Sequence, residues 1–178
     1  MRRAAGGATA VLALALLAPA EAGAVSTGER IGDVGAIALP AMGLVAAALH
    51  HDRKGALQLA EAYAATMAVV YVLKPTIDRT RPNGGGQSFP SGHAASAFAG
   101  AAFLQLRYGW AWGLPAGAAA AYVGYSRVHA KEHWTSDVLA GGALGIGGAL
   151  AFTRRYHKLA LQPVAGRREL GLFVHATW

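Results

Sequence analysis

The chain has 178 residues, enough for one domain, and only 14% of them are charged while 54% are hydrophobic, against about 25% charged residues in an ordinary soluble domain. It contains 24 glycines and no cysteine, which excludes disulfides, a catalytic thiol and thiolate metal ligands. The net charge is +7, but the basic residues stand in short loops between apolar segments, so we expect a membrane or anionic ligands and no nucleic-acid partner.

The first residues, 1–24, have the pattern of a secretory signal peptide. Two arginines precede an apolar run, and small residues follow it in small-x-small order. We expect cleavage near residue 24, although an uncleaved first membrane helix has the same pattern. In both cases the following chain begins on the outer side of the membrane. We divide it into a helical domain at 25–158 and a C-terminal tail at 159–178.

Further apolar segments predict a bundle of helices. They cover 31–49, 56–73, 93–106, 110–125 and 137–152. A full membrane span needs about 20 residues, so the third and fourth segments are short, and Glu61 interrupts the second. Together with the N-terminal segment, they predict an all-α bundle of five to six helices that spans a membrane. The last stretch of the tail, LGLFVHATW, has the composition of a strand.

Loop charges predict the orientation of this bundle. The loops at 50–55 and 154–158 are basic, and the turn at 107–109 carries one arginine. Cytoplasmic loops carry an excess of Lys and Arg, so these three are expected in the cytoplasm. The loops at 74–92 and 126–136 must then face outward, and they contain nearly all the unusual polar residues.

Three polar motifs lie in or beside the outward loops. They are Lys74 with Arg81-Pro82 after six residues, Pro90-Ser91-Gly92-His93, and Ser126-Arg127 with His133 after five residues and Asp137 after three more. In this order and spacing they resemble the signature of the type 2 phosphatidic acid phosphatase family, whose superfamily includes bacterial acid phosphatases and vanadium haloperoxidases. Each motif alone is a weak signal, whereas three complete motifs in order are a strong one.

The residue types in these motifs suit phosphoryl transfer. His133 and Asp137 are four residues apart, so on a helix they share a face, and the carboxylate can accept from one imidazole nitrogen while the other attacks. The same spacing also suits half a metal site, although no third ligand follows nearby. A phosphoryl group carries charge on three oxygens, which guanidinium groups bind well. Basic residues beside apolar runs also contact lipid headgroups, and we prefer that reading for Arg79.

The second motif suits the start of a helix that binds an anion. Ser91 is in position to cap the helix, and Gly92 allows the backbone to approach a ligand. Free N–H groups at a helix start favour an anion, and His93 beside that anion can give a proton to a leaving oxygen. A histidine here is also a common packing residue, and His133 downstream favours the catalytic role. The glycines at 84–86 predict a flexible approach to this turn.

The family resemblance implies a mechanism without a metal or other cofactor. In it, His133 attacks phosphorus and forms a phosphohistidine, Asp137 orients the imidazole, and His93 protonates the leaving group and then activates water. The residues implied to hold the phosphoryl oxygens are Lys74, Arg81, Ser91, Gly92 and Arg127. The resemblance also implies a helical bundle with its site at one end.

The expected substrate is a lipid phosphate or diphosphate, in the bacterial inner membrane with the site facing the periplasm. Undecaprenyl diphosphate, phosphatidylglycerol phosphate, phosphatidic acid and lipid A phosphates all fit. A soluble periplasmic acid phosphatase of broad specificity has the same motifs, and a vanadate-dependent haloperoxidase binds vanadate in the same cage. A non-enzymatic membrane scaffold does not explain why both histidines and the cations gather on one side.

Overall fold

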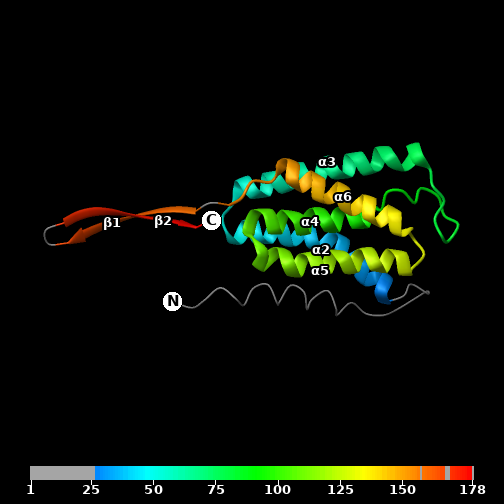
Figure 1. Ribbon diagram of the computed structural model, residues 1–178, viewed down its shortest axis with the longest axis horizontal. Coiled ribbons are helices and arrows are strands. Elements are labelled where there is room, and N and C mark those ends of the chain that lie inside the picture. The colour runs from blue at the N-terminus through cyan, green and yellow to red at the C-terminus, as the bar shows by residue number, and fades with distance from the viewer. Residues whose placement is uncertain (1–26, 157, 167–168, 178) are drawn as a thin grey trace.

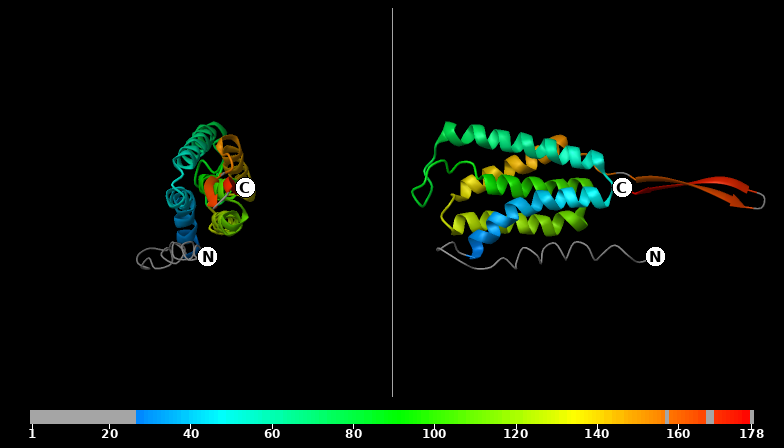
Figure 2. Two further views of the ribbon diagram at one scale, coloured as in Figure 1. Left: turned by 90° about the vertical axis from the view of Figure 1, so that its left-hand side faces the viewer. Right: turned by 180° about the vertical axis from the view of Figure 1, so that it is seen from behind.

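The computed structural model describes residues 27–156, 158–166 and 169–177, so the expected signal peptide lies outside the described residues. Within this part the chain forms α2 (Thr27–Leu49), α3 (Arg53–Ile77), α4 (Gly92–Tyr108), α5 (Trp110–His129) and α6 (Thr135–Phe152), followed by β1 (Lys158–Gly166) and β2 (Glu169–Thr177). Each helix contains one of the predicted apolar segments. The helices lie side by side along the long axis of the molecule (Figures 1 and 2). The prediction of an all-α bundle is therefore confirmed.

The C-terminal tail adds a two-stranded antiparallel hairpin to the bundle. Its strands pair from Lys158 with Thr177 to Gly166 with Glu169, and the hairpin extends away from the helices (Figure 1). The strand predicted at the chain's end is thus confirmed. The first strand was not predicted, because Pro163 and Gly166 were read as breaks.

The central helix of the bundle is α4. It packs most extensively against α6, then against α5 and α2. Its side chains Phe103 and Leu104 are fully buried. Its 17 residues are too few for a comfortable membrane span of their own, and its neighbours cover it instead of lipid.

Small residues allow the helices to approach closely. A Cβ atom added at Gly141 of α6 would lie 2.3 Å from the carbonyl oxygen of Ser91, and one at Gly145 would lie 2.3 Å from that of Ala95. These glycines are four residues apart, so they form one stripe that faces α4. Small residues at this spacing are typical of helix contacts in membranes.

The outer faces of three helices suit a membrane. By length and apolar composition α2, α3 and α6 are each able to cross one. Large apolar side chains project from these faces, with Val72 66% exposed and Leu139 68% exposed. Exposed apolar surface on this scale marks contact with lipid or protein.

Arg107, expected in the short turn at 107–109, lies in the last turn of α4. It is only 5% exposed, and its Nε and second terminal nitrogen donate to the two carboxylate oxygens of Asp52, each at 2.7 Å. Asp52 also caps α3 by accepting from the Gly55 N–H at 2.9 Å. Arg107 therefore joins the loop before α3 to the end of α4. Because its side chain is buried, it adds no exposed positive charge to the loop charges from which the orientation was predicted.

Candidate active site

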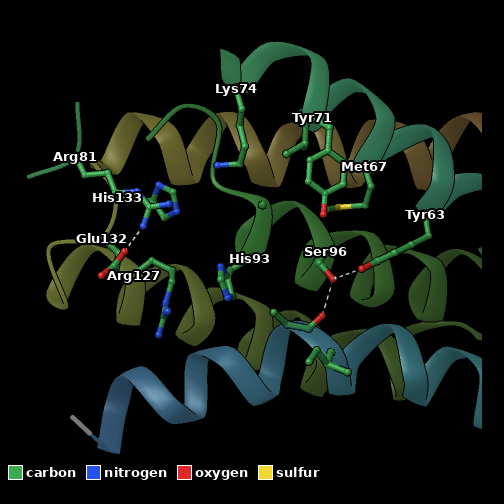
Figure 3. A pocket seen from close by; sticks show the side chains of 14 residues that line it. Tyr63, Met67, Tyr71, Lys74, Arg81, His93, Ser96, Arg127, Glu132 and His133 are labelled. Atoms are coloured by element: carbon green, nitrogen blue, oxygen red, sulfur yellow. Dashed lines mark hydrogen bonds and ion pairs between the residues drawn. The ribbon is translucent and has the colours of Figure 1, made fainter. Parts of the chain in front are cut away.

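The starts of α2, α4 and α6 and the ends of α3 and α5 meet at one end of the bundle (Figure 1). A cavity of about 300 Å³ opens there. The motif residues that line it are Lys74, Arg81, Gly92, His93, Arg127 and His133. Figure 3 shows their side chains around this common space. The structure thus brings parts of all three motifs together, while Ser91 and Asp137 lie fully buried beneath the cavity.

A cap and a backbone hydrogen bond fix the second motif beside the third. The Ser91 hydroxyl accepts from the Ala94 N–H at 3.4 Å, so the predicted N-cap of α4 is confirmed. The Ser91 N–H donates to the carbonyl of Asp137 at 2.9 Å. Gly141, which has no side chain, also allows the backbone carbonyl of Ser91 to lie close against α6. These two contacts hold the first turns of α4 and α6 together.

His133 lies in the short loop between α5 and α6. Its backbone N–H donates to the carbonyl of Arg127 at 3.2 Å, and its side chain is buried in the cavity wall. Burial, together with the positive charges of Arg81 and Lys74, lowers the pKa of His133 to about 4, although Asp137 and the Ser88 backbone act in the opposite direction. The imidazole is therefore neutral near pH 7, with a lone pair available to attack phosphorus.

Asp137 does not accept directly from His133 as the sequence predicted. Its Oδ2 accepts from the Ser88 hydroxyl at 2.5 Å and from the Trp134 N–H at 3.1 Å. The Ser88 hydroxyl in turn lies 3.5 Å from Nδ1 of His133. The prediction was wrong because α6 begins only at Thr135, so His133 precedes the helix and does not share a helical face with Asp137.

Arg79 is a second correction, since the lipid-headgroup interpretation does not describe its contacts. Its terminal nitrogen donates to Oδ1 of Asp137 at 2.8 Å and to the Ser136 hydroxyl at 2.7 Å. Its guanidinium also lies 5.4 Å from the centre of the Trp134 ring. Arg79 and Ser88 are thus two side chains that donate to the buried carboxylate of Asp137. Neither residue belongs to a motif, so spacing gave no signal for them.

Arg81 is held from several sides. It forms an ion pair with Glu132, and its Nε donates to the carbonyl of Gly86 at 3.1 Å. The backbone N–H of Arg81 donates to the carbonyl of Gly85 at 2.6 Å. The glycine segment therefore fixes this arginine in addition to leading to α4. Glu132, which also accepts from Asn83 at 3.0 Å, was not predicted as a site residue.

Arg127 is almost fully buried and contacts α2. It donates to Oδ1 of Asp33 at 2.7 Å and to the carbonyl of Glu29. The same oxygen of Asp33 lies 3.0 Å from Nε2 of His93. Asp33 was not predicted, because it stands alone in an apolar segment. Lys74 instead donates to a backbone carbonyl, that of Gln87, at 2.9 Å.

The rest of the cavity wall is largely apolar. Away from the charged end it is lined by Ile37, Met67, Val70 and Tyr71, with Tyr63 and Ser96 as polar neighbours (Figure 3). Across the described residues, no group of three or more His, Cys, Asp or Glu side chains forms a candidate metal site. The cavity thus has a cationic end with two histidines, while the rest of its wall is largely apolar.

Comparison with known sequences supports a common origin with lipid phosphatases. The profile of the PAP2 superfamily matches residues 83–160. The lipid A 4'-phosphatase of Helicobacter pylori is 35% identical over 140 residues, which cover 72% of this chain and 70% of that protein. The lipid A 1-phosphatase of Porphyromonas gingivalis is 46% identical over 77 residues, 41% of this chain and 17% of that protein.

Solved structures share the fold. LpxE of Aquifex aeolicus superposes with a TM-score of 0.62 at 23% identity, covering 70% of this chain and 81% of that chain. A transmembrane PAP2-type phosphatidylglycerolphosphate phosphatase of Bacillus subtilis gives a TM-score of 0.58 at 25% identity, covering 80% and 81%. With the family profile and the Helicobacter pylori relative, these findings show that the chain belongs to the PAP2 superfamily.

Proposed function

We propose that this chain removes phosphate from a phosphorylated lipid through a phosphohistidine on His133, without a metal ion. Membership in the PAP2 superfamily and likeness to two lipid A phosphatases make it a hydrolase of phosphoric esters. The names of these relatives favour a phosphate monoester on a glycolipid such as lipid A. A lipid diphosphate is the second substrate class to be tested.

One observation carries the proposal: His93 and His133 line the same cavity, together with Lys74, Arg81 and Arg127. One histidine has a neutral imidazole, as a nucleophile requires. The cations suit the charge that spreads over the phosphoryl oxygens in the transition state. The apolar part of the cavity wall beside them suits a lipid chain.

The proposed reaction has two steps. A nitrogen of His133 attacks phosphorus as the bond to the ester oxygen breaks, and His93 gives its proton to that oxygen. Water then attacks the phosphohistidine, His93 takes a proton from the water, and the bond between phosphorus and His133 breaks. Asp137 acts through Ser88, whose hydroxyl lies between the carboxylate and the imidazole.

Charge distribution supports a site that faces the periplasm. At the site end, arginines are paired with carboxylates, as in Arg79 with Asp137 and Arg127 with Asp33. The opposite end carries basic side chains that are exposed, namely Arg53, Lys54, Arg154 and Arg155. Exposed Lys and Arg favour the cytoplasmic side.

This orientation is testable because the chain has no cysteine. Single cysteines at Asn83 and Lys54 lie at opposite ends of the bundle. In spheroplasts, a membrane-impermeant maleimide should label Asn83→Cys and should label Lys54→Cys only after lysis. The reverse pattern would contradict the orientation.

The substrate is tested by phosphate release from purified protein. The panel comprises lipid A carrying a 1- or a 4'-phosphate, phosphatidylglycerol phosphate, phosphatidic acid, undecaprenyl diphosphate and a soluble aryl phosphate. We expect the highest kcat/KM for a lipid A phosphate. Equal kcat/KM for the soluble ester, in protein extracted without detergent, would favour a soluble acid phosphatase. Halide oxidation with added vanadate would favour a haloperoxidase.

The nucleophile is tested with His133→Ala. This variant should fold and release no phosphate, because only the neutral imidazole forms the covalent intermediate. A substrate with a radiolabelled phosphate, quenched in alkali, should label the wild-type protein and leave His133→Ala unlabelled. Retained turnover in the variant would overturn the assignment.

A further inference from the structure

Asp33 is an acidic residue of α2 that lies outside all three motifs and still touches two of them. Its Oδ1 lies 3.0 Å from Nε2 of His93 and 2.7 Å from a terminal nitrogen of Arg127. The Asp33 side chain is 49% exposed and that of His93 is 41% exposed, whereas that of Arg127 is 3% exposed. The contact is therefore partly exposed, and it links the proposed proton donor to a cation proposed to bind the phosphoryl group, both of which line the cavity.

We infer that Asp33 is a positioning residue for His93, which it orients and stabilises in the protonated form that the leaving group needs. The inference rests on the proposed function. A carboxylate that accepts from one ring nitrogen fixes an imidazole and stabilises its charged form, as in other His–carboxylate pairs. Here the pair joins α2 to the first turn of α4.

The charges that face His93 explain why it needs this partner. Burial is the largest cause that lowers the pKa of His93 below its usual value, and Arg127 of α5 and Lys74 of α3 lower it further. Asp33 is the carboxylate that raises this pKa, and it offsets part of the lowering. Arg81, Glu132 and His133 line the same cavity. Like charges at this range disfavour an imidazolium, so the carboxylate offsets the cations that bind phosphate.

The protons balance with Asp33 ionised throughout. The His93 imidazolium has two N–H groups, of which one is held by Asp33 and the other is left for the substrate. That second proton moves to the ester oxygen as its bond to phosphorus breaks and the bond from His133 forms. In the second step, neutral His93 regains a proton from the attacking water. Asp33 neither gains nor loses a proton.

The test compares two substrates of the same Asp33→Asn protein. Dodecyl phosphate has an alkoxide leaving group that needs a proton, while 4-nitrophenyl phosphate has a leaving group stable without one. General acid catalysis contributes about 10² to 10⁴ in rate. We expect kcat/KM to fall about 30- to 100-fold for dodecyl phosphate and less than about threefold for the aryl ester.

Matched variants support this comparison. Asp33→Glu should recover part of the loss with dodecyl phosphate, since it restores a carboxylate. Glu61→Gln removes an exposed carboxylate of α3 and should leave kcat/KM unchanged for both substrates. The ratio of the two substrates is measured on one preparation, so it does not depend on the fraction of folded protein.

Each other outcome overturns the role. Equal losses for both esters would mean that Asp33 acts only by holding Arg127. A rise in kcat/KM for both esters would mean that Oδ1 of Asp33 competes with a substrate oxygen for His93 and Arg127. An active wild type with an unchanged Asp33→Asn variant overturns the role of Asp33 alone. A wild type that hydrolyses neither ester overturns the proposed function with it.

Discussion

The hydroxyl of Ser88 donates to the carboxylate of Asp137 at 2.5 Å, and both side chains are fully buried. The same hydroxyl lies 3.5 Å from Nδ1 of His133. The backbone N–H of Ser88 donates to the carbonyl of Arg79 at 2.7 Å, which fixes the residue in the loop before α4. The Ser88 hydroxyl, from the loop between α3 and α4, therefore lies between the carboxylate and the proposed nucleophile.

Ser88→Ala should lower kcat because it removes the group between Asp137 and His133. A hydrogen bond to a charged group contributes about 1.5–3 kcal/mol. If that free energy is realised in the transition state, kcat falls about 10- to 150-fold. Steady-state kinetics with a lipid phosphate measure the loss. Thr76→Ala, which removes an exposed hydroxyl bonded to its own helix, is the control, and an equal loss there would contradict the role.

Arg79→Gln should lower kcat for lipid and soluble substrates alike. Arg79 forms an ion pair with the buried Asp137, the carboxylate that we propose acts on His133, so its loss should affect the chemical step. Because Arg79 is partly exposed, we expect an effect of about tenfold and partial recovery in Arg79→Lys. Arg53→Gln, at the far end, should leave kcat unchanged. A raised KM for lipid substrates only would instead favour contact with headgroups.

The low pKa of His133 predicts where its imidazole titrates. Burial and the cations Arg81 and Lys74 hold this pKa at about 4, below the usual value of about 6.5. The nucleophile should therefore stay neutral from about pH 7 down to about pH 5. Its NMR signal in detergent, assigned with His133→Asn, should titrate near pH 4. In Arg81→Gln the midpoint should rise, because a neighbouring positive charge is removed.

The same shift has a consequence for stability. Since the pKa of His133 is lower in the folded protein than in the unfolded chain, the unfolded chain takes up the proton first. The contribution of His133 to the free energy of unfolding should thus be complete above about pH 6.5 and decrease as the pH falls toward about 4. A midpoint near 6.5 in the wild type would contradict both expectations.

Two glycines of α6 give a matched test of helix packing. A Cβ at Gly141 would lie 2.3 Å from the carbonyl oxygen of Ser91, whereas one at Gly147 would meet no atom within 4 Å. Gly141→Ala should therefore destabilise the protein by about 1–3 kcal/mol and lower activity by displacing Ser91. Gly147→Ala should leave thermal unfolding in detergent unchanged or raise its midpoint. Equal changes in the unfolding midpoint for the two substitutions would argue against close contact of α6 with α4.

The helices and the cap could be predicted because their causes are local. Each apolar segment is a continuous run of chain, and the cap of α4 is a contact between Ser91 and a residue three positions later. The motif histidines and cations were identified from the resemblance of three motifs, in order and spacing, to those of a known family. The predicted helical contact between His133 and Asp137 was wrong, because it depended on where α6 begins. The helix begins at Thr135, two residues after His133, so His133 lies in the preceding loop.

The sequence by itself determined the apolar helices, their small residues and the motif side chains that line the cavity. Tertiary structure alone decided that Asp33 meets His93, that Ser88 stands between Asp137 and His133, and that Arg79 pairs with Asp137. These contacts join residues from separate helices and loops, and no spacing along the chain encodes them. They exist because the helix ends and loops that carry these residues meet at one end of the bundle, where close packing of α6 against α4 at Gly141 holds Asp137 beside the second motif.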